Sequence, residues 1–75
     1  MIDHAAIYLR EFGVSLNERD AAFMLDYRAQ NIASACSWDY RSRQAAYRLA
    51  LAALLQGRGV RVAQRAARLA RWGAK

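Results

Sequence analysis

The apolar residues of this chain recur at steps of three and four, the spacing that places side chains on one face of an α-helix. No stretch of the 75 residues keeps the period of two that a half-buried strand requires, and none contains proline. The pattern predicts an all-α protein, a small bundle of three to four helices with a C-terminal helical hairpin. We expect residues 1–75 to form a single domain.

Start and stop signals divide the first part of the pattern into two helices. Asp3 is placed as the N-cap of a first helix, and Gly13 is placed to end it. Directly afterwards, Ser15 and Glu18 match the S-x-x-E capping box, in which a hydroxyl and a carboxylate satisfy free backbone amides. The sequence therefore predicts a second helix over about residues 16–36.

The second predicted helix carries apolar residues on two faces. One face is mostly small and suits the close approach of a neighbouring helix. It comprises Ala21, Leu25, Ala29, Ile32 and Cys36. The other face is partly aromatic and is open to two interpretations, contact with the first helix or contact with another protein. It comprises Leu16, Phe23, Met24 and Tyr27.

Two further helices are expected in the second half of the chain. Asp39 is the predicted N-cap of a helix that ends at Gln56, before Gly57. Its expected buried stripe comprises Tyr40, Gln44, Tyr47, Leu51, Leu54 and Leu55. A fourth helix, from about Val60 to Trp72, follows a linker short enough for an αα-hairpin.

Charge divides the chain at about residue 40. All six carboxylates lie in an acidic half, residues 1–40, with three arginines and a net charge of −3. Residues 41–75 form a basic half that holds nine of the twelve basic residues, no carboxylate and a net charge of +9. The excess of arginine over lysine is typical of a high-GC coding bias, but the absence of every carboxylate is not explained in this way. A field of this shape attracts an anionic partner to one end of the molecule.

The fourth helix is a basic amphipathic helix. Its apolar side carries Val62, Ala63, Ala66, Leu69 and Ala70, and arginines recur on the other side at steps that can follow a phosphate backbone. A solvated surface is the simpler interpretation, because arginine stems also cover apolar neighbours. Membrane-surface binding is disfavoured, because alanine buries little area in lipid.

The third and fourth helices, with the residues just before them, have two other interpretations. The third and fourth helices resemble a helix-turn-helix in outline, but Arg58 and Gly59 stand where that motif has a buried apolar group, which favours a plain helical hairpin. Four aromatic residues interleaved with arginine are candidates for stacking on unpaired bases, although core packing is the commoner role for such residues. They are Trp38, Tyr40, Tyr47 and Trp72.

Several classes of function are disfavoured. Cys36 and His4 are the only residues of their types, so we expect no disulfide, no metal and no cofactor. The serines lack a suitably placed histidine base and no glycine-rich phosphate loop follows a strand, so we expect no enzyme and no small-molecule substrate. No apolar run reaches the ~20 residues of a membrane helix. We expect a cytoplasmic protein without membrane contact.

Self-association is expected because the potential core is small. The chain is 56% hydrophobic, but seventeen residues are alanine, which buries little area. A homodimer would supply the missing burial. An alternative arrangement pairs the acidic half of one chain with the basic half of another, and it would loosen as salt rises.

The leading interpretation is a small non-catalytic regulatory protein whose basic C-terminal hairpin binds nucleic acid, DNA or RNA. The expected nucleic-acid or anion contacts are Arg58, Arg61, Arg65, Arg68, Arg41, Arg43 and Arg48. The alternative is an adaptor or inhibitor, of the type that phages and mobile elements encode, that binds an acidic host protein through an aromatic helix face. The expected partner interface is Phe23, Met24, Tyr27 and Trp72.

Overall fold

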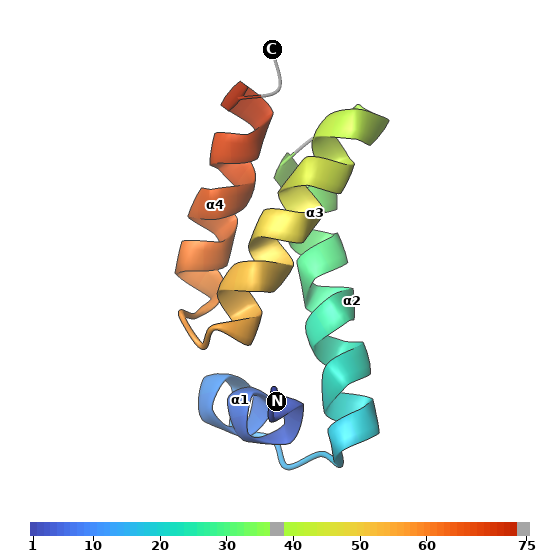
Figure 1. Cartoon of the computed structure of the whole chain (residues 1–75), viewed down its shortest axis with the longest axis vertical. Helices are drawn as coiled ribbons and strands as arrows, with labels where there is room; N and C mark the ends of the chain where they lie inside the picture. The colour runs from blue at the N-terminus through green and yellow to red at the C-terminus, as the bar shows by residue number, and fades with distance from the viewer. Residues whose placement is uncertain (37–38, 74–75) are drawn as a thin grey trace.

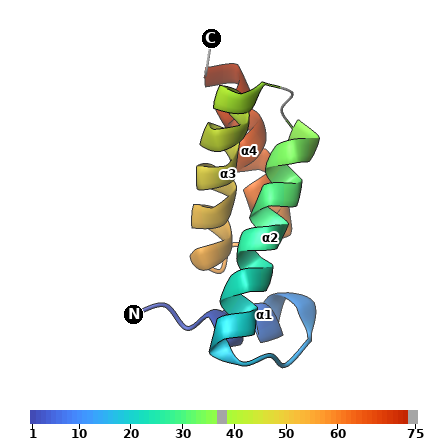
Figure 2. The same cartoon turned by 90° about the vertical axis from the view of Figure 1, so that its right-hand side faces the viewer.

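Four helices and no strand make up the part of the chain that the computed structural model describes, the backbone of residues 1–36 and 39–73 and the side chains of residues 1–36 and 39–70. The helices are α1 (His4–Phe12), α2 (Glu18–Cys36), α3 (Tyr40–Leu55) and α4 (Val60–Gly73). Figures 1 and 2 show α2, α3 and α4 side by side along the long axis, with α1 across one end. The predicted all-α helical bundle is confirmed.

Both ends of α1 follow the sequence signals. The Asp3 carboxylate accepts a hydrogen bond from the Ala6 amide at 3.0 Å, as an N-cap should. Gly13 ends the helix in the left-handed conformation, with φ of 70°, and its amide donates to the Leu9 carbonyl at 2.8 Å. These two residues fix α1 at nine residues.

The start of α2 differs from the predicted one. Asn17, rather than Ser15, is the cap: its Oδ1 accepts from the Asp20 amide at 2.8 Å, and its Nδ2 donates to the Asp20 carboxylate at 3.2 Å. The helix therefore begins at Glu18, two residues after the expected start. The predicted capping box between Ser15 and Glu18 is wrong because the Glu18 carboxylate is engaged by another helix.

Glu18 joins α2 to the N-terminus of α1. Its two carboxylate oxygens accept hydrogen bonds from the amides of His4 and Ala5, each at 3.0 Å, and the His4 Nδ1 lies 2.5 Å from Oε2. The hydrogen bond from Ala5, followed by those from His4, lowers the pKa of Glu18 from 4.5 to about 2. With Asp3, this carboxylate satisfies three of the free amides at the start of α1.

The core between α2, α3 and α4 consists mainly of alanine. Leu25 and Leu54 are the only large side chains among the described residues that are fully buried. The alanines packed around them are Ala21, Ala29, Ala33, Ala46, Ala50, Ala53, Ala63, Ala67 and Ala70. Small side chains on all three inner faces let the helices approach closely.

The stripe predicted for α3 is confirmed in part, since Leu54 lies in the core and three further members pack against it. Of its six residues only Leu54 is fully buried, whereas Tyr47, Leu51 and Leu55 are half-buried and Tyr40 is 70% exposed. The inner face of α3 carries Ala46, Ala50 and Ala53 instead. Because α3 packs against both α2 and α4, its inner face must be small, and its large residues lie at the edges.

The two faces predicted for α2 have different outcomes. The small face is confirmed as part of the core, with Cys36 half-buried at its end. The aromatic face divides: Leu16 and Met24 pack against the core, whereas Phe23 is 66% exposed and Tyr27 is 51% exposed. The guanidinium carbon of Arg28 lies 4.6 Å from the ring centre of Phe12, and this cation–π contact joins α2 to α1.

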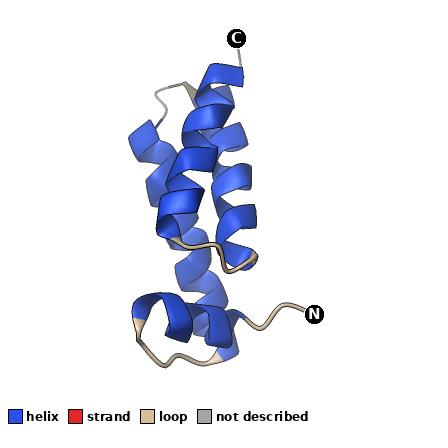
Figure 3. Ribbon diagram, turned by 90° about the vertical axis from the view of Figure 1, so that its left-hand side faces the viewer, coloured by secondary structure: helices blue, strands red, loops and turns tan. Residues whose placement is uncertain are grey.

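The turn between α3 and α4 lies against α1, as Figure 3 shows. Gly57 and Gly59 both adopt positive φ, and the Arg58 amide donates to the Ala53 carbonyl at 3.1 Å, which closes the end of α3. A Cβ at Gly57 would meet the end of the flexible Arg10 side chain, which can move aside, so it is the φ of 72° that favours glycine at this position. Among the described residues, no helix has the length and apolar composition to cross a membrane.

The capping of α2 gives a first prediction. Replacing Asn17 with alanine should destabilise the protein by about 1 kcal/mol, because an amide of the first turn loses its acceptor. The control, Ser15→Ala, should leave stability unchanged, and urea unfolding of both variants measures the difference. Equal destabilisation by the two substitutions would contradict the assignment of Asn17 as the cap.

Glu18 gives a second prediction, on acid stability. Because folding lowers the Glu18 pKa from 4.5 to about 2, the unfolded chain binds the proton first. The stabilisation is complete above pH 4.5 and is lost as the pH falls from 4.5 towards 2. Thermal unfolding across this range should show a steeper loss in the natural chain than in Glu18→Gln.

The contribution of a second carboxylate, that of Asp39, must be separated from the contribution of Glu18. The backbone hydrogen bond from Ser42 lowers the pKa of Asp39, which therefore contributes to the same acid transition. The Asp39→Asn variant, with Glu18 intact, measures that contribution. An identical pH dependence for the natural chain and Glu18→Gln would contradict the role given to Glu18.

Candidate nucleic-acid interface

Four exposed arginines lie along the outer side of α4 and the turn before it. Arg61, Arg65 and Arg68 are spaced by four and three residues, so they fall within an arc of ~60° on the helix. Arg58 precedes them in the turn and is exposed as well. We call these four residues the α4 basic face, and the buried alanines of α4 lie on the opposite side.

Leu69 interrupts the amphipathic pattern predicted for α4. The sequence places it on the apolar side, but it is 64% exposed. At ~100° per residue it lies about 120° from Ala63, which marks the centre of the buried side. The prediction is wrong for this residue because the alanine contacts define a narrow buried stripe that ends before Leu69.

The charges of the α4 basic face are not neutralised within the described part of the chain. The ion pair between His4 and Glu18 lies at the far end of the molecule from the C-terminus. No described carboxylate pairs with any of the four arginines. A face of this kind concentrates positive potential and attracts anions.

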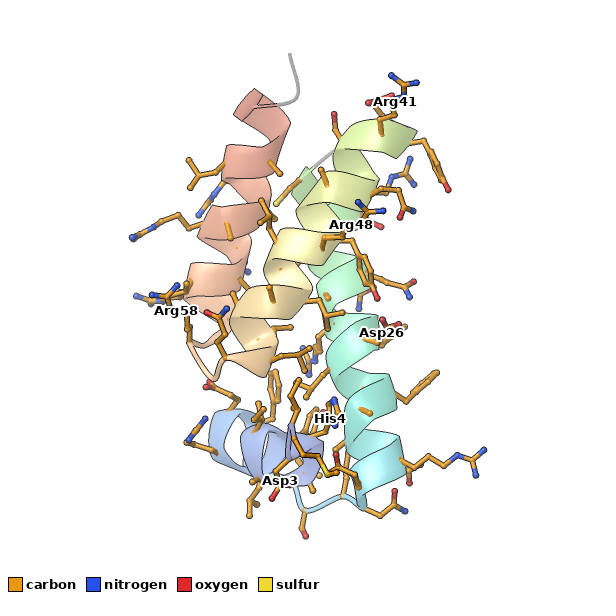
Figure 4. The ribbon with its side chains drawn as sticks, viewed as in Figure 1. Asp3, His4, Asp26, Arg41, Arg48 and Arg58 are labelled. Atoms are coloured by element: carbon orange, nitrogen blue, oxygen red, sulfur yellow. The ribbon has the colours of Figure 1, made fainter. Side chains whose placement is uncertain are left out.

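The arginines predicted in α3 do not join this face. Arg41 and Arg48 are exposed and lie seven residues apart on the outer side of α3. Figure 4 shows Arg58 at the turn on the α4 side, whereas Arg41 and Arg48 extend from α3. The structure therefore divides the predicted set into the α4 basic face and a second pair, Arg41 and Arg48, which we call the α3 pair.

Arg43, the remaining predicted arginine, is half-buried and lines a pocket between α2 and α3. The pocket has a volume of about 450 Å³ and opens to solvent. Its lining comprises Asp26, Gln30, Ala33, Ser34, Tyr40, Arg43, Gln44 and Tyr47. Sequence reasoning missed this pocket, although the signal was present: Tyr40, Gln44 and Tyr47 share a stripe that was predicted to be buried.

A hydrogen bond between Tyr47 and Asp26 forms one wall of the pocket. The Tyr47 hydroxyl donates to Oδ1 of Asp26, and Nε2 of Gln30 donates to Oδ2 at 2.7 Å. The hydrogen bond to Asp26, followed by burial, raises the pKa of Tyr47. Both carboxylate oxygens of Asp26 are therefore engaged, and α2 is held to α3 by a polar contact.

The predicted partner interface is only partly brought together. Phe23 and Tyr27 lie four residues apart on the exposed side of α2 and form a small aromatic surface. Met24 is half-buried against the core and does not join them. The side chain of Trp72 and the whole of Trp38 lie outside the described residues. The stacking role predicted for these two residues is therefore not tested by the structure.

Comparison of the chain with protein-family models, curated proteins and solved structures found no significant match. The function is therefore inferred from the residues and the geometry of this chain alone.

The contact between Tyr47 and Asp26 gives a third prediction. Tyr47→Phe should destabilise the protein by about 1 kcal/mol, because it removes one hydrogen bond between α2 and α3. Urea unfolding measures the change. The control is Tyr27→Phe, which removes a hydroxyl from the exposed side of α2 and should have no effect. Equal stabilities of the natural chain and Tyr47→Phe would show that the contact does not hold the two helices together.

Proposed function

We propose that this protein is a small non-catalytic regulatory protein that binds nucleic acid through the C-terminal helical hairpin of α3 and α4. The observation that carries the proposal is the α4 basic face, four exposed arginines with no carboxylate partner among the described residues. For such arginines, contact with phosphates is more favourable in free energy than exposure to solvent, because each contact releases counterions condensed on the nucleic acid.

The spacing of the α4 basic face suits a phosphate backbone. Arg61 and Arg68 are seven residues apart in α4, which corresponds to ~10 Å along the helix, and Arg58 in the preceding turn extends the set. Guanidinium groups distributed over that length can contact several phosphates, and bidentate hydrogen bonds fix their orientation. Phosphate contacts carry no base information, so this face positions the protein on nucleic acid with little sequence discrimination.

The absence of carboxylates from the basic half supports the same proposal. Residues 41–75 carry a net charge of +9, and the acidic residues lie in the half that contains α1 and α2. The field therefore orients the molecule as it approaches a polyanion, with α4 leading. We place this activity in the cytoplasm.

A second candidate function rests on the exposed aromatic pair of α2. Phe23 and Tyr27 are large apolar side chains at the molecular surface, and such residues anchor protein interfaces. In this candidate the protein is an adaptor or inhibitor that binds an acidic host protein, and the α4 basic face steers the encounter. The same pair is also available to the expected homodimer, which would add burial to a core made mainly of alanine.

Salt dependence and charge reversal give a fourth prediction. Four phosphate contacts predict that affinity for duplex DNA falls about 100-fold between ~50 and ~200 mM salt. Fluorescence anisotropy with a labelled duplex measures it. Changing Arg61, Arg65 and Arg68 together to glutamate should abolish binding, and undiminished binding by that variant would show that the proposed face is wrong.

Single variants supply a matched comparison. Arg65→Glu on α4 and Arg19→Glu on the exposed side of α2 change the net charge equally. Arg19→Glu measures how much DNA binding weakens from the loss of positive charge alone. Arg65→Glu should weaken DNA binding by more than that amount. Phe23→Ala should leave DNA binding intact, and it would weaken the complex with a protein partner if the second candidate is correct.

A further inference from the structure

We propose that the pocket between α2 and α3 binds one unpaired base of a single-stranded nucleic acid, with Tyr40 as the surface on which the base stacks. The inference rests on the proposed function for its biological ligand and extends it from phosphate contact to the class of strand that is bound. It concerns a site separate from the α4 basic face, on the opposite edge of α3.

The size and position of the pocket fit one base. Its volume of about 450 Å³ lies within the range of ~300–1,000 Å³ found for small-ligand sites, near the lower end. It opens to solvent between two helices, so a base attached to a strand can enter while its backbone stays outside. A duplex cannot use it, because paired bases remain stacked inside the helix.

Tyr40 provides the stacking surface. It lines the pocket and is still 70% exposed, so one side of its ring is available to a ligand. The Asp39 carboxylate accepts hydrogen bonds from the amide and the hydroxyl of Ser42, both at 3.0 Å, and these contacts fix the first turn of α3. The ring is therefore attached to a rigid segment, and stacking on it costs little ordering of the backbone.

The remaining walls match the edge of a base. The Gln44 amide has no hydrogen-bond partner in the described part of the chain, so it can donate and accept. Gln30 donates its Nε2 to Asp26, which leaves its carbonyl oxygen as an acceptor aimed at no other described group. Base edges present both donors and acceptors, and glutamine side chains satisfy both.

Charge determines the orientation of the ligand. The pocket wall carries the Asp26 carboxylate as well as the Arg43 guanidinium, so it presents no excess of positive charge to a phosphate. Each Asp26 oxygen accepts one hydrogen bond within the protein and keeps a lone pair that can accept from an exocyclic amino group. The α3 pair is exposed on the neighbouring part of α3, with Arg41 and Arg48 ~10 Å apart along the axis. These two arginines can contact the phosphates on either side of an inserted base. The base then lies inside the pocket and the backbone lies over the α3 pair.

The test measures binding at the pocket and binding at the α4 basic face separately. The first probe is adenosine 5′-monophosphate, titrated into ¹⁵N-labelled protein while the side-chain amide signals of Gln30 and Gln44 are followed by NMR. We expect saturable shifts of these signals, and none with inorganic phosphate. The shifts should be lost in Tyr40→Ala and kept in Tyr40→Phe, because stacking requires the ring and not the hydroxyl.

The second probe is a labelled ten-nucleotide single strand, compared by anisotropy with a duplex of the same length. Tyr40→Ala should weaken single-strand binding about 10-fold and change duplex binding less than twofold. Tyr27→Ala, which removes an exposed aromatic ring outside the pocket, is the matched control and should change neither. Circular dichroism checks that both variants keep their helices.

The outcomes separate this inference from the proposed function. Equal shifts with adenosine monophosphate and phosphate, no shifts at all, or unchanged single-strand binding in Tyr40→Ala would each overturn the base pocket. Loss of duplex binding in Arg65→Glu with the monophosphate shifts retained would support both proposals. Monophosphate shifts at Gln30 and Gln44 without any duplex binding would support the pocket and refute the α4 basic face.

Discussion

The close approach of α2, α3 and α4, which alanine permits, is the constraint on which the other features of the structure depend. Alanines fill most of the space between the three helices, and of the described side chains only Leu25 and Leu54 are large and fully buried. Helices that meet at such short distances leave no room for aromatic rings on their inner faces. The aromatic side chains of α2 and α3 that the structure describes therefore lie at the edges and on the surface, where Tyr40 and Tyr47 line a pocket and Phe23 is exposed.

Because alanine contributes little burial, polar contacts have a large part in orienting the helices. Glu18 caps α1 from α2, and Tyr47 donates to Asp26 across α2 and α3. The guanidinium of Arg10 lies beside Gly57, where α1 meets the turn before α4. Each contact joins neighbouring helices at a defined point, which a uniform alanine surface cannot do by itself.

The same packing separates two kinds of basic side chain. On α4 the alanine stripe is narrow and the arginines lie opposite it, so their charges face solvent as a continuous surface. On α3 the helix is covered on two sides, and its arginines divide between the outer surface and the pocket beside α2. A surface suited to phosphates and a pocket suited to a ring thus occur on different edges of one bundle.

Local signals in the sequence determined the helices and most of their ends. Asp3, Gly13 and Asp39 cap helices as predicted, because a cap depends on residues within one turn of it. The exposed arginines of α4 were also predictable, because their spacing follows the helical period. The inner face of α3 was predictable only in part, since the apolar period identified Leu54 but not the alanines Ala46, Ala50 and Ala53.

Only the tertiary structure decided which residues of different helices meet. Glu18 has the right spacing to cap its own helix, yet it caps α1, because the chain reversal at residues 13–17 brings free amides within its reach. Nothing in the helical spacing of Arg43 distinguishes it from Arg41 and Arg48. It nevertheless lines the pocket, because α2 packs beside that edge of α3. The sequence by itself determined the helical periods and the distribution of charge, which are local properties. The pocket and the separation of the arginines depend on how three helices pack, and this is a property of the whole chain.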